Sequence, residues 1–498
     1  PEDQIVTRCN EVKTRKLLAD CKAANYNFIR VWGGGYYPDE YFYDYCDENG
    51  IIVWQDFMFA CSAYLLTEEF EETVRGEVRD NVIRLRNHPS LGLWCGNNEI
   101  ESAWEYWGLP EDEEAKRDYL IIFEDIIPQV LKAYDPCENT FYWPSSPSSG
   151  GGFKDASSNH AGDMHYWDVW HNFKPIEAFR EFYYRFCSEY GFESLPDIKT
   201  CRAFADETKG DFDLCSPVMA AHQKCVQGNE KIMYYLAQMV RYPYDFKQLI
   251  YSSQLVQADC IRSNVEHMRR ARGRCMGSAY WQVNDSNPVI SWSSIDYFGR
   301  WKGLHYYAKR FYAPCLISCD DTHRKKPVLN ISNERMTAFE GIVRWKLRNN
   351  KAEILQSGEK SVNVPALTAQ NVLTIDLSDE LKNRTDPREK YLEYSIMENG
   401  KVLSFGTTLF VRPKEFTFLE PAITYGISES EDKFALTFCA ENYAKSVCLS
   451  LKTADCVFSD NWFDIHGKEP VTIMIDKASL SRKMTAQELS EELEIMHN

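Results

Sequence analysis

Residues 90–99 have the sequence Ser90-Leu91-Gly92-Leu93-Trp94-Cys95-Gly96-Asn97-Asn98-Glu99. A short apolar run of this kind is typical of a strand buried in a parallel sheet. The run ends in a glycine, two amides and a carboxylate. In α/β folds, the polar residues that directly follow a parallel strand lie at the edge of the sheet where functional sites form. The segment therefore predicts a parallel α/β fold with Glu99 at its functional edge.

Six further short apolar or aromatic runs surround this one in the sequence. With it, the predicted strands are 27–32, 51–55, 90–95, 141–144, 163–167, 185–188 and 277–281. Segments with helical periodicity alternate with them, at 13–25, 68–86, 113–134, 176–184 and 245–273. Such alternation up to about residue 285 favours a (β/α)8 TIM barrel over an open sheet.

A closed barrel of this class needs eight strands, and the sequence supplies seven. Residues 1–11 are too short and too polar to form another. We therefore expect the first barrel strand to be missing from the chain, with the remainder of the protein preceding Pro1.

The pattern of apolar and polar residues changes after residue 314. Alternating apolar and polar residues predict strands at 327–331, 341–346, 372–377, 390–397 and 402–405, the last two joined by an Asn399-Gly400 turn. Further strands are expected at 434–438 and 471–475, and a terminal helix at 485–497. We expect a catalytic barrel at 1–315, an immunoglobulin-like β-sandwich at 316–412, and a second one with the terminal helix at 413–498.

The net charge and the aromatic content of the chain indicate which kinds of molecule it can bind. The 74 acidic and 56 basic residues give a net charge of −18, which disfavours binding to a phosphate backbone, so nucleic acid is not expected as a partner. Aromatic residues make up 14% of the chain, and many stand beside Gly, Asn, Asp or Glu. Aromatic faces next to hydrogen-bonding groups suit sugars. An aromatic-rich core accounts for the same composition.

The number and spacing of the cysteines indicate the cellular compartment in which the protein works. The 17 cysteines are scattered without a repeating spacing, and an odd number cannot be fully paired, which favours a reducing cytoplasm over a disulfide framework. Cys215, His222 and Cys225, or Cys315 with Cys319, are candidate zinc ligands, but no CxxC pair supports them and buried thiols explain them better. No run of 18 apolar residues exists, so no membrane span is expected.

Two strand ends carry the carboxylates that matter most. Glu99 follows the strand at 90–95, and Glu189 follows the strand at 185–188. Glycoside hydrolysis needs such a pair, one acid to protonate the leaving oxygen and one carboxylate to attack the sugar or activate water. A strand-end glutamate can also cap a helix or pair with arginine. We expect Glu101 and Glu193, the neighbouring carboxylates, to be exposed at helix starts.

Several motifs lie at or near the predicted strand ends. They are Arg30-Val31-Trp32-Gly33-Gly34-Gly35, Trp54-Gln55-Asp56-Phe57-Met58, Arg86-Asn87-His88-Pro89-Ser90, Gly96-Asn97-Asn98-Glu99, Ser188-Glu189-Tyr190-Gly191-Phe192, Tyr280-Trp281-Gln282-Val283-Asn284-Asp285, Ser291-Trp292 and Asp296-Tyr297-Phe298-Gly299-Arg300-Trp301-Lys302. Together they resemble the β-mannosidase branch of glycoside hydrolase family 2. The resemblance is dense up to about residue 315 and weak beyond it. Gly33-Gly34-Gly35 is then a tight turn, because no P-loop or GxGxxG context accompanies it.

The resemblance implies a retaining mechanism with specific roles. Members of this clan carry the acid/base after the fourth barrel strand and the nucleophile after the seventh; with the first strand counted as missing, these positions are Glu99 and Glu189. The mechanism requires no metal or organic cofactor. Roles in substrate binding are implied for Arg30, Trp32, Asn98, His165, Trp167, Trp281 and Asp285.

Among these, Trp32 and Trp281 resemble residues that wall the sugar site, Asn98 the donor to the 2-hydroxyl, and Arg30 a group that steadies the nucleophile. Core packing is the alternative for each tryptophan, and a buried salt bridge for Arg30. His165 and Trp167 are expected to line the pocket. Family members also carry β-sandwich domains ahead of the barrel, one of which supplies an acidic residue to the sugar site.

The expected reaction is the release of terminal non-reducing β-D-mannose from oligosaccharides or glycan ends, with retention of configuration. Within the same class, a β-glucosaminidase, β-galactosidase or β-glucuronidase is the alternative, since these sugars differ at the 2-, 4- or 6-substituent. A non-catalytic carbohydrate-binding module is the alternative from a different class.

Overall fold

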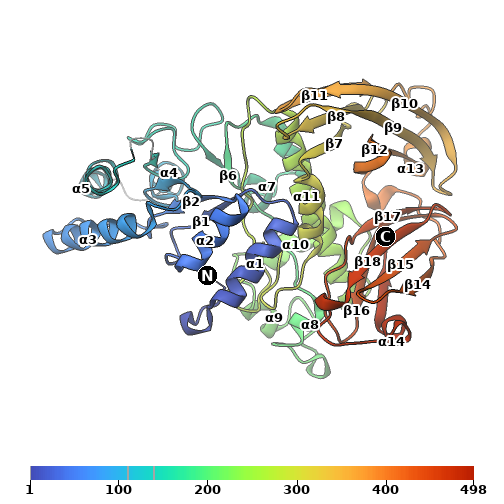
Figure 1. Ribbon diagram of the computed structural model, residues 1–498, viewed down its shortest axis with the longest axis horizontal. Helices are drawn as coiled ribbons and strands as arrows, with labels where there is room; N and C mark the ends of the chain where they lie inside the picture. The colour runs from blue at the N-terminus through green and yellow to red at the C-terminus, as the bar shows by residue number, and fades with distance from the viewer. Residues whose placement is uncertain (1, 109–111, 138–140) are drawn as a thin grey trace. The chain divides into compact units, whose positions relative to one another are not determined.

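The computed structural model describes residues 2–108, 112–137 and 141–498 (Figure 1). These residues form two compact units. The first contains the chain up to Gly191 together with Gly273–Trp281, and the second contains Phe192–Arg272 and Gln282–Asn498. All seven predicted barrel strands fall in the first unit.

Parallel strands form the centre of the first unit. β1 (Phe28–Val31), β2 (Ile52–Asp56), β3 (Leu91–Cys95) and β4 (Tyr142–Trp143) pair in that order, each parallel to the next. β5 (Met164–His165) pairs in parallel with β6 (Cys187–Glu189). The segment 277–281 lies parallel to β6 through the bridges Cys187↔Ser278 and Gly191↔Trp281. Each of the seven predicted segments thus has a parallel partner, the first four in one group and the last three in another.

Helices of the first unit follow the expected capping and burial patterns. Thr67 caps α3 (Glu68–Leu85) by accepting a hydrogen bond from the Phe70 backbone N–H, and Val74, Val78 and Val82 repeat every four residues on its buried face. The others are α1 (Glu11–Ala23), α2 (Glu40–Asn49), α4 (Ile100–Tyr106), α5 (Glu113–Leu120), α6 (Ile127–Tyr134) and α7 (Asp168–His171).

Two helix predictions in this unit need correction. The predicted helix at 113–134 is interrupted between α5 and α6 by the π-helical turn Ile121–Ile126. The predicted helix at 176–184 is only a 3₁₀ turn, Ile176–Glu181, whose buried residues Ile176, Ala178 and Phe179 are two or three positions apart. That spacing matches the tighter three-residue turn better than an α-helix.

The core of the first unit lies between the four-stranded sheet and its helices. Phe57 and Trp94 stack with ring centroids 4.9 Å apart, and the buried valines of α3 belong to the same cluster. This packing holds the carboxyl ends of β2 and β3 in place, and these ends carry Asp56 and the Asn97-Asn98-Glu99 segment.

The second unit begins with helices. They are α8 (Ile198–Cys201), α9 (Pro217–Ala221), α10 (Gly228–Met239), α11 (Phe246–Arg270) and α12 (Gly303–Phe311). α11 starts at Asp245, whose side chain accepts a hydrogen bond from the Gln248 backbone N–H, and it is buried along most of its length. The predicted helix at 245–273 is thereby confirmed within a few residues.

Two antiparallel sheets follow in the sequence, drawn in orange in Figure 1. Their strands are β7 (Cys315–Asp320), β8 (Val328–Asn333), β9 (Phe339–Asn349), β10 (Ile354–Val364), β11 (Thr368–Thr374), β12 (Lys390–Glu398) and β13 (Lys401–Leu409). Sheet β10-β9-β12-β13 and sheet β11-β8-β7 share one core, to which Leu329 and Val343 belong. The predicted turn is present, with Asn399 at φ 50° and Gly400 at φ 77° between β12 and β13.

The last part of the chain is a second all-β region, drawn in red in Figure 1. Sheet β14-β15-β18 consists of Thr424–Glu429, Lys433–Cys439 and Val471–Asp476, and sheet β17-β16-β19 of Phe463–His466, Tyr443–Leu451 and Leu493–Met496. The aromatic rings of Phe438 and Phe463 meet with centroids 5.6 Å apart.

The predicted terminal helix at 485–497 is wrong in its second half. A capping box between Thr485 and Glu488 starts α14, but this helix spans only Ala486–Glu492. The chain then extends as β19, where Leu493 pairs with Leu451 and Ile495 with Leu449 of β16. Strand pairing with a segment some forty positions earlier overrides the local helical pattern.

No disulfide bond is formed between cysteines in the described residues. Within the described parts of the chain, no helix has the length and apolar character needed to cross a membrane.

Candidate active site

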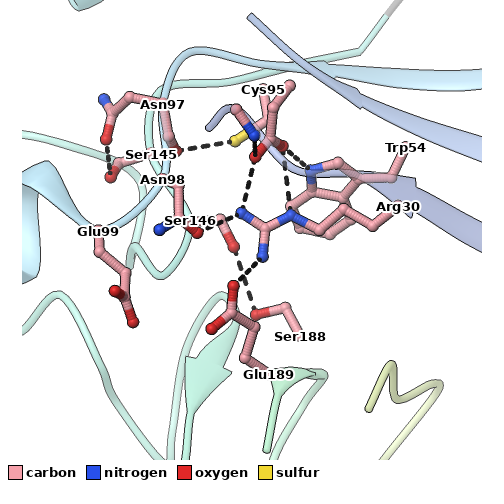
Figure 2. A network of polar contacts seen from close by, with 12 residues as sticks. Arg30, Trp54, Cys95, Asn97, Asn98, Glu99, Ser145, Ser146, Ser188 and Glu189 are labelled. Carbon is pink, nitrogen blue, oxygen red and sulfur yellow. Dashed lines mark hydrogen bonds and ion pairs between the residues drawn. The ribbon is translucent and has the colours of Figure 1, made fainter. Parts of the chain in front are cut away.

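Arg30, at the carboxyl end of β1, is the hub of a buried polar network (Figure 2). Its Nη2 donates to Asp56 Oδ2 and to Asn98 Oδ1, each at 2.8 Å, and its Nη1 donates to Glu189 Oε1 at 2.9 Å. The side chain is only 6% exposed. One guanidinium thus connects residues from the ends of β1, β2, β3 and β6.

Asp56 fixes the orientation of this guanidinium. Its carboxylate also accepts hydrogen bonds from Trp54 Nε1 at 2.8 Å and from the Gly33 backbone N–H at 3.0 Å. A buried cation is tolerated only when counter-charges and acceptors surround it. The Asp56 carboxylate anchors Arg30 on one side, which leaves Nη1 aimed at Glu189.

Glu189 ends β6 and is almost completely buried. Oε1 accepts from Arg30, while Trp167 Nε1 donates to Oε2 at 3.3 Å. Burial raises the pKa of Glu189, and the Glu99 carboxylate raises it further, whereas the nearby His165 and Arg30 oppose the rise. Two donors hold the carboxylate in one orientation, as an attacking nucleophile requires.

Glu99 stands at the turn between β3 and α4, in the left-handed conformation at φ 62°. Its backbone N–H donates to Ser146 O at 2.8 Å, and this contact fixes the turn. Asn97 caps α4 by accepting from the Ile100 N–H at 3.1 Å. Burial raises the pKa of Glu99 to about 6, although the Arg30 charge acts in the opposite direction. A carboxyl with this pKa is suited to donate a proton near neutral pH.

His165, at the end of β5, lies between the two glutamates. Its Nδ1 is 2.7 Å from Glu99 Oε1 and 3.3 Å from Glu189 Oε2. Burial lowers the pKa of His165 to about 4, so the ring is neutral at working pH. Nε2 lies 3.0 Å from Ser146 Oγ and 3.4 Å from Arg30 Nη1. We assign the ring hydrogen to Nδ1, because the guanidinium can only donate, the hydroxyl is able to donate, and Nδ1 faces two carboxylates.

The two glutamates are close enough for a double displacement. One oxygen of Glu99, one oxygen of Glu189 and a ring nitrogen of His165 all lie within 4.8 Å of one another. A separation of about 5 Å between carboxyl groups is typical of retaining glycosidases, whereas inverting enzymes keep them wider apart to admit water.

Three of the tryptophans predicted to line the site are partly exposed, and one of them contacts Glu189. Trp32 and Trp281 meet edge to face with centroids 5.1 Å apart, and both are partly exposed. Trp167 contacts Glu189 through its indole N–H. Partial exposure distinguishes these rings from the fully buried Trp94 and Trp170, and leaves aromatic surface for a sugar.

The structure brings eight of the nine predicted site residues into the first unit, namely Arg30, Trp32, Asn98, Glu99, His165, Trp167, Glu189 and Trp281. Asp285 belongs to the second unit, where its carboxylate accepts from the hydroxyls of Ser291 and Ser293 at 2.7 Å each. Its role in substrate binding stays a prediction.

Glu101 stands in the first turn of α4, as predicted, but neither Glu101 nor Glu193 is exposed. Both are fully buried. Glu101 Oε1 accepts from the Phe153 backbone N–H at 2.8 Å, and Glu193 Oε2 accepts from Gln223 Nε2 at 2.8 Å. The predicted exposure was wrong because the donors to these carboxylates, Phe153 and Gln223, lie 30 or more positions away in the sequence, where local patterns do not reveal them.

Two residues of the network were missed as candidates. Asp56 directly follows the β2 strand, and its position at a strand end was the signal that could have found it. Cys61 lies close to Glu99 and Asn98, but nothing in its sequence context indicated that.

Two groups of described residues gather three possible metal ligands within 4.8 Å, Asp44-Asp47-His88 and Glu99-His165-Glu189. In the first, His88 contacts Asp47 and Glu40 through its two ring nitrogens. In the second, Arg30 already supplies a positive charge to Glu189. We assign a metal to neither group.

Parallel strands whose ends carry two closely spaced carboxylates, with a partly exposed tryptophan beside one of them, match the arrangement typical of retaining glycoside hydrolases. Residues 326–415 match the family described as a Mannosidase Ig/CBM-like domain, and residues 418–498 match an Ig-fold domain. The C-terminal part of the chain is therefore immunoglobulin-like.

Sequence relatives agree over most of the chain. "Beta-mannosidase B" of Aspergillus terreus is 31% identical over 505 residues, covering 95% of this chain and 59% of that protein. "Beta-mannosidase" of Bos taurus is 34% identical over 346 residues, covering 64% of this chain and 38% of that protein. The chain thus spans less than two thirds of the length of either relative.

Solved structures show the same relationship. The beta-D-mannosidase from Dictyoglomus thermophilum superposes with a TM-score of 0.90 at 30% identity, over 100% of this chain and 59% of that one. The exo-chitosanase CsxA of Amycolatopsis orientalis shares the fold, with a TM-score of 0.74 at 15% identity over 98% of this chain and 61% of that one. Over nearly all of its length the chain is therefore similar to proteins of the β-mannosidase branch of glycoside hydrolase family 2.

Proposed function

We propose that the intact protein is a retaining exo-β-mannosidase that releases terminal β-D-mannose from the non-reducing ends of oligosaccharides. The observation that carries this proposal is the proximity of Glu99 and Glu189, which each have one carboxylate oxygen within 4.8 Å of the other and beside Nδ1 of His165. Similarity to the β-mannosidase branch supports the choice of sugar.

In the first step, Glu189 attacks the anomeric carbon while Glu99 protonates the departing glycosidic oxygen. Arg30 and Trp167 each hold one oxygen of Glu189. The raised pKa of Glu99, about 6, keeps a useful fraction of this acid protonated near neutrality.

In the second step, Glu99, now a carboxylate, removes a proton from water, and the hydroxide displaces Glu189 from the anomeric carbon. Neutral His165 donates through Nδ1 to Glu99 Oε1, which stabilises this ionised form. Two inversions at the same carbon give net retention of configuration. The chemistry needs no metal or cofactor.

A panel of nitrophenyl β-glycosides separates mannose from the alternative sugars. The intact natural protein is expected to turn over the β-mannoside at least tenfold faster, in kcat/KM, than the β-glucosaminide, β-galactoside or β-glucuronide, because sugar discrimination by a single hydroxyl is typically tenfold or more. Absence of β-mannoside turnover overturns the assignment.

We further propose that the parallel strands belong to a (β/α)8 barrel and that domains divide at 1–315, 316–412 and 413–498. Support comes from contacts that link β1 to later strands, since Tyr26 hydrogen-bonds Tyr280 through the phenol oxygens and Arg30 reaches Glu189. The family matches at 326–415 and 418–498 support the later divisions. The missing first strand stays a prediction.

A cytoplasmic location is likewise kept as a proposal, based on the number and spacing of the cysteines. Fractionation of the source cells tests it, and recovery of the protein in a secreted fraction would contradict it.

A further inference from the structure

Cys61 occupies an unusual place beside the acid/base. It follows β2 in the sequence and adopts the left-handed conformation at φ 53°, which is uncommon for a residue with a side chain. Its backbone N–H donates to Asn98 O at 2.9 Å, and the bridge between Ala60 and Asn98 aligns the two segments. The backbone thereby presents the thiol to the turn that carries Glu99.

The sulfur makes two polar contacts. Asn98 Nδ2 donates to Cys61 Sγ at 3.3 Å, and Sγ donates to Glu99 Oε2 at 3.7 Å. Asn98 Oδ1 in turn accepts from Arg30 Nη2. A chain of hydrogen bonds therefore runs from Arg30 through Asn98 and Cys61 to the acid/base, while the same Arg30 contacts Glu189 directly.

The two oxygens of Glu99 have different partners, and this difference indicates what the hydrogen bonds from Arg30 through Asn98 and Cys61 can do. Oε1 accepts from Nδ1 of His165, so the exchangeable proton of the acid resides on Oε2. Oε2 is the oxygen that Cys61 contacts. Burial, and next the Glu99 carboxylate, raise the pKa of the thiol to about 11, so it remains a neutral S–H donor.

We propose that Cys61 is a positioning residue of the acid/base step, whose thiol holds Oε2 of Glu99 and the amide of Asn98 in their working orientation. The inference rests on the proposed function. A donor on Oε2 favours the ionised form of Glu99, so Cys61 assists mainly when Glu99 acts as a base. The other charged or polar groups that face Glu99 are Arg30 from β1, Asn98 beside it, His165 from β5 and Glu189 from β6.

The test compares Cys61→Ala and Cys61→Ser with the intact natural protein. Removing the S–H donor should move the alkaline limb of kcat/KM for nitrophenyl β-mannoside upward by about half a pH unit, since one net hydrogen bond is worth roughly that much. Cys61→Ser restores a donor and should return the limb toward its original position. Cys137→Ala, at an exposed thiol of the same unit, should leave the limb unchanged.

A second substrate separates positioning from a general structural role. 2,4-Dinitrophenyl β-mannoside has a leaving group that needs no proton, so kcat/KM of Cys61→Ala on it should stay within about twofold. Its kcat reports the hydrolysis of the glycosyl-enzyme, where Glu99 is the base, and should fall about fivefold. A merely structural effect would lower both values together.

The outcomes distinguish the two proposals. An active Cys61→Ala protein with an unchanged alkaline limb and unchanged kcat on the dinitrophenyl substrate overturns the role of Cys61 and leaves the proposed function standing. A natural protein that turns over neither β-mannoside overturns both. Equal losses on both parameters, without rescue by serine, also overturn the positioning role.

Discussion

At the scale of single residues, the site depends on how charge is distributed over two glutamates, one histidine and one arginine. Burial raises the pKa of both glutamates, and the Arg30 charge opposes the rise at both. His165 is neutral and contacts both. The direct hydrogen bond from Arg30 Nη1 to Glu189 Oε1 favours the ionised form of that residue, and such local differences between like groups are a general way for one site to run acid and nucleophile chemistry together.

The pH dependence of kcat/KM follows from these environments. Glu99 must be protonated to act as an acid, so kcat/KM for nitrophenyl β-mannoside should decline as pH rises above about 6, the pKa of Glu99. Glu189 must be ionised, and because its pKa is raised, the acid limb should lie above that of an ordinary glutamate. A rate profile that stays flat up to pH 9 would contradict the assignment of Glu99.

Replacement of Glu189 by glutamine tests the nucleophile. The amide keeps the shape and hydrogen-bonding capacity of the side chain but cannot attack carbon, so kcat should fall by on the order of 10⁴-fold or more while mannose binding persists. Turnover by stopped assay and binding by calorimetry give the two readouts. Glu69→Gln, at an exposed position of α3, is the matched control.

If Glu189→Gln retains turnover, the nucleophile lies elsewhere. A non-catalytic binding module would show sugar binding in the natural protein without any turnover for the substitution to remove. Labelling by a fluorinated mannosyl inactivator at a residue other than Glu189 would also contradict the assignment.

At the scale of elements, close approach of strand-end segments makes the network possible. A Cβ on Gly33 would lie 2.5 Å from Phe59 O and 2.7 Å from Phe57 O, both of them backbone atoms. The Gly33 N–H also donates to Asp56 Oδ2, so this contact couples the turn after β1 to the anchor of Arg30. The glycine is needed for space and not for a special φ.

Gly33→Ala is therefore expected to destabilise the protein by about 1–3 kcal/mol, because the backbone after β2 cannot yield as a flexible side chain would. Activity should fall as well, since Asp56 and Arg30 shift together. Thermal denaturation and kcat/KM are the two measurements.

Gly76→Ala is the matched control. Gly76 lies inside α3, and nothing is within 4 Å of a Cβ built on it. Alanine is the better helix former there and should stabilise by about 0.5–1 kcal/mol. If the two substitutions have equal effects on stability, the crowding argument at Gly33 fails.

At the scale of the whole molecule, buried acids link stability to pH. Glu193 is fully buried in the second unit, and burial raises its pKa to about 8, although Gln223 and the nearby Lys302 oppose the rise. Glu193 Oε1 has no hydrogen-bond partner among the described residues. A carboxyl that must remain protonated when folded, but ionises when unfolded, favours the folded state only while the pH is low.

Whether folding stability rises or falls with pH depends on which state, folded or unfolded, binds more protons. Between about pH 4.5 and 8 the folded chain holds a proton on Glu193 that the unfolded chain releases, so stability should fall as the pH rises through this window. Glu193→Gln removes that fall, by on the order of a few kcal/mol at pH 8. The difference in Tm between pH 5 and pH 8 measures it. Glu431→Gln, at an exposed turn, is the control and should show the same difference in Tm as the natural protein. If Glu193→Gln also shows that same difference, Glu193 does not link stability to pH.

Sequence alone determined the features whose free energy is local. The apolar run 91–95 became β3, Asn399-Gly400 became a turn at positive φ, and Glu99 and Glu189 stand at strand ends as expected. Periodicity, turn chemistry and the polar residues after a strand all act within a few positions. They can therefore be read without knowledge of the fold.

Tertiary structure decided what depends on partners distant in sequence. It buried Glu101 and Glu193, turned residues 493–496 from helix to strand, and brought Cys61 and His165 to Glu99. Burial and pairing arise from contacts between segments up to hundreds of residues apart, and a carboxylate's pKa depends on those contacts. The sequence therefore determined that two glutamates stand at strand ends, and only the packed structure decided which charges, donors and thiol surround each of them.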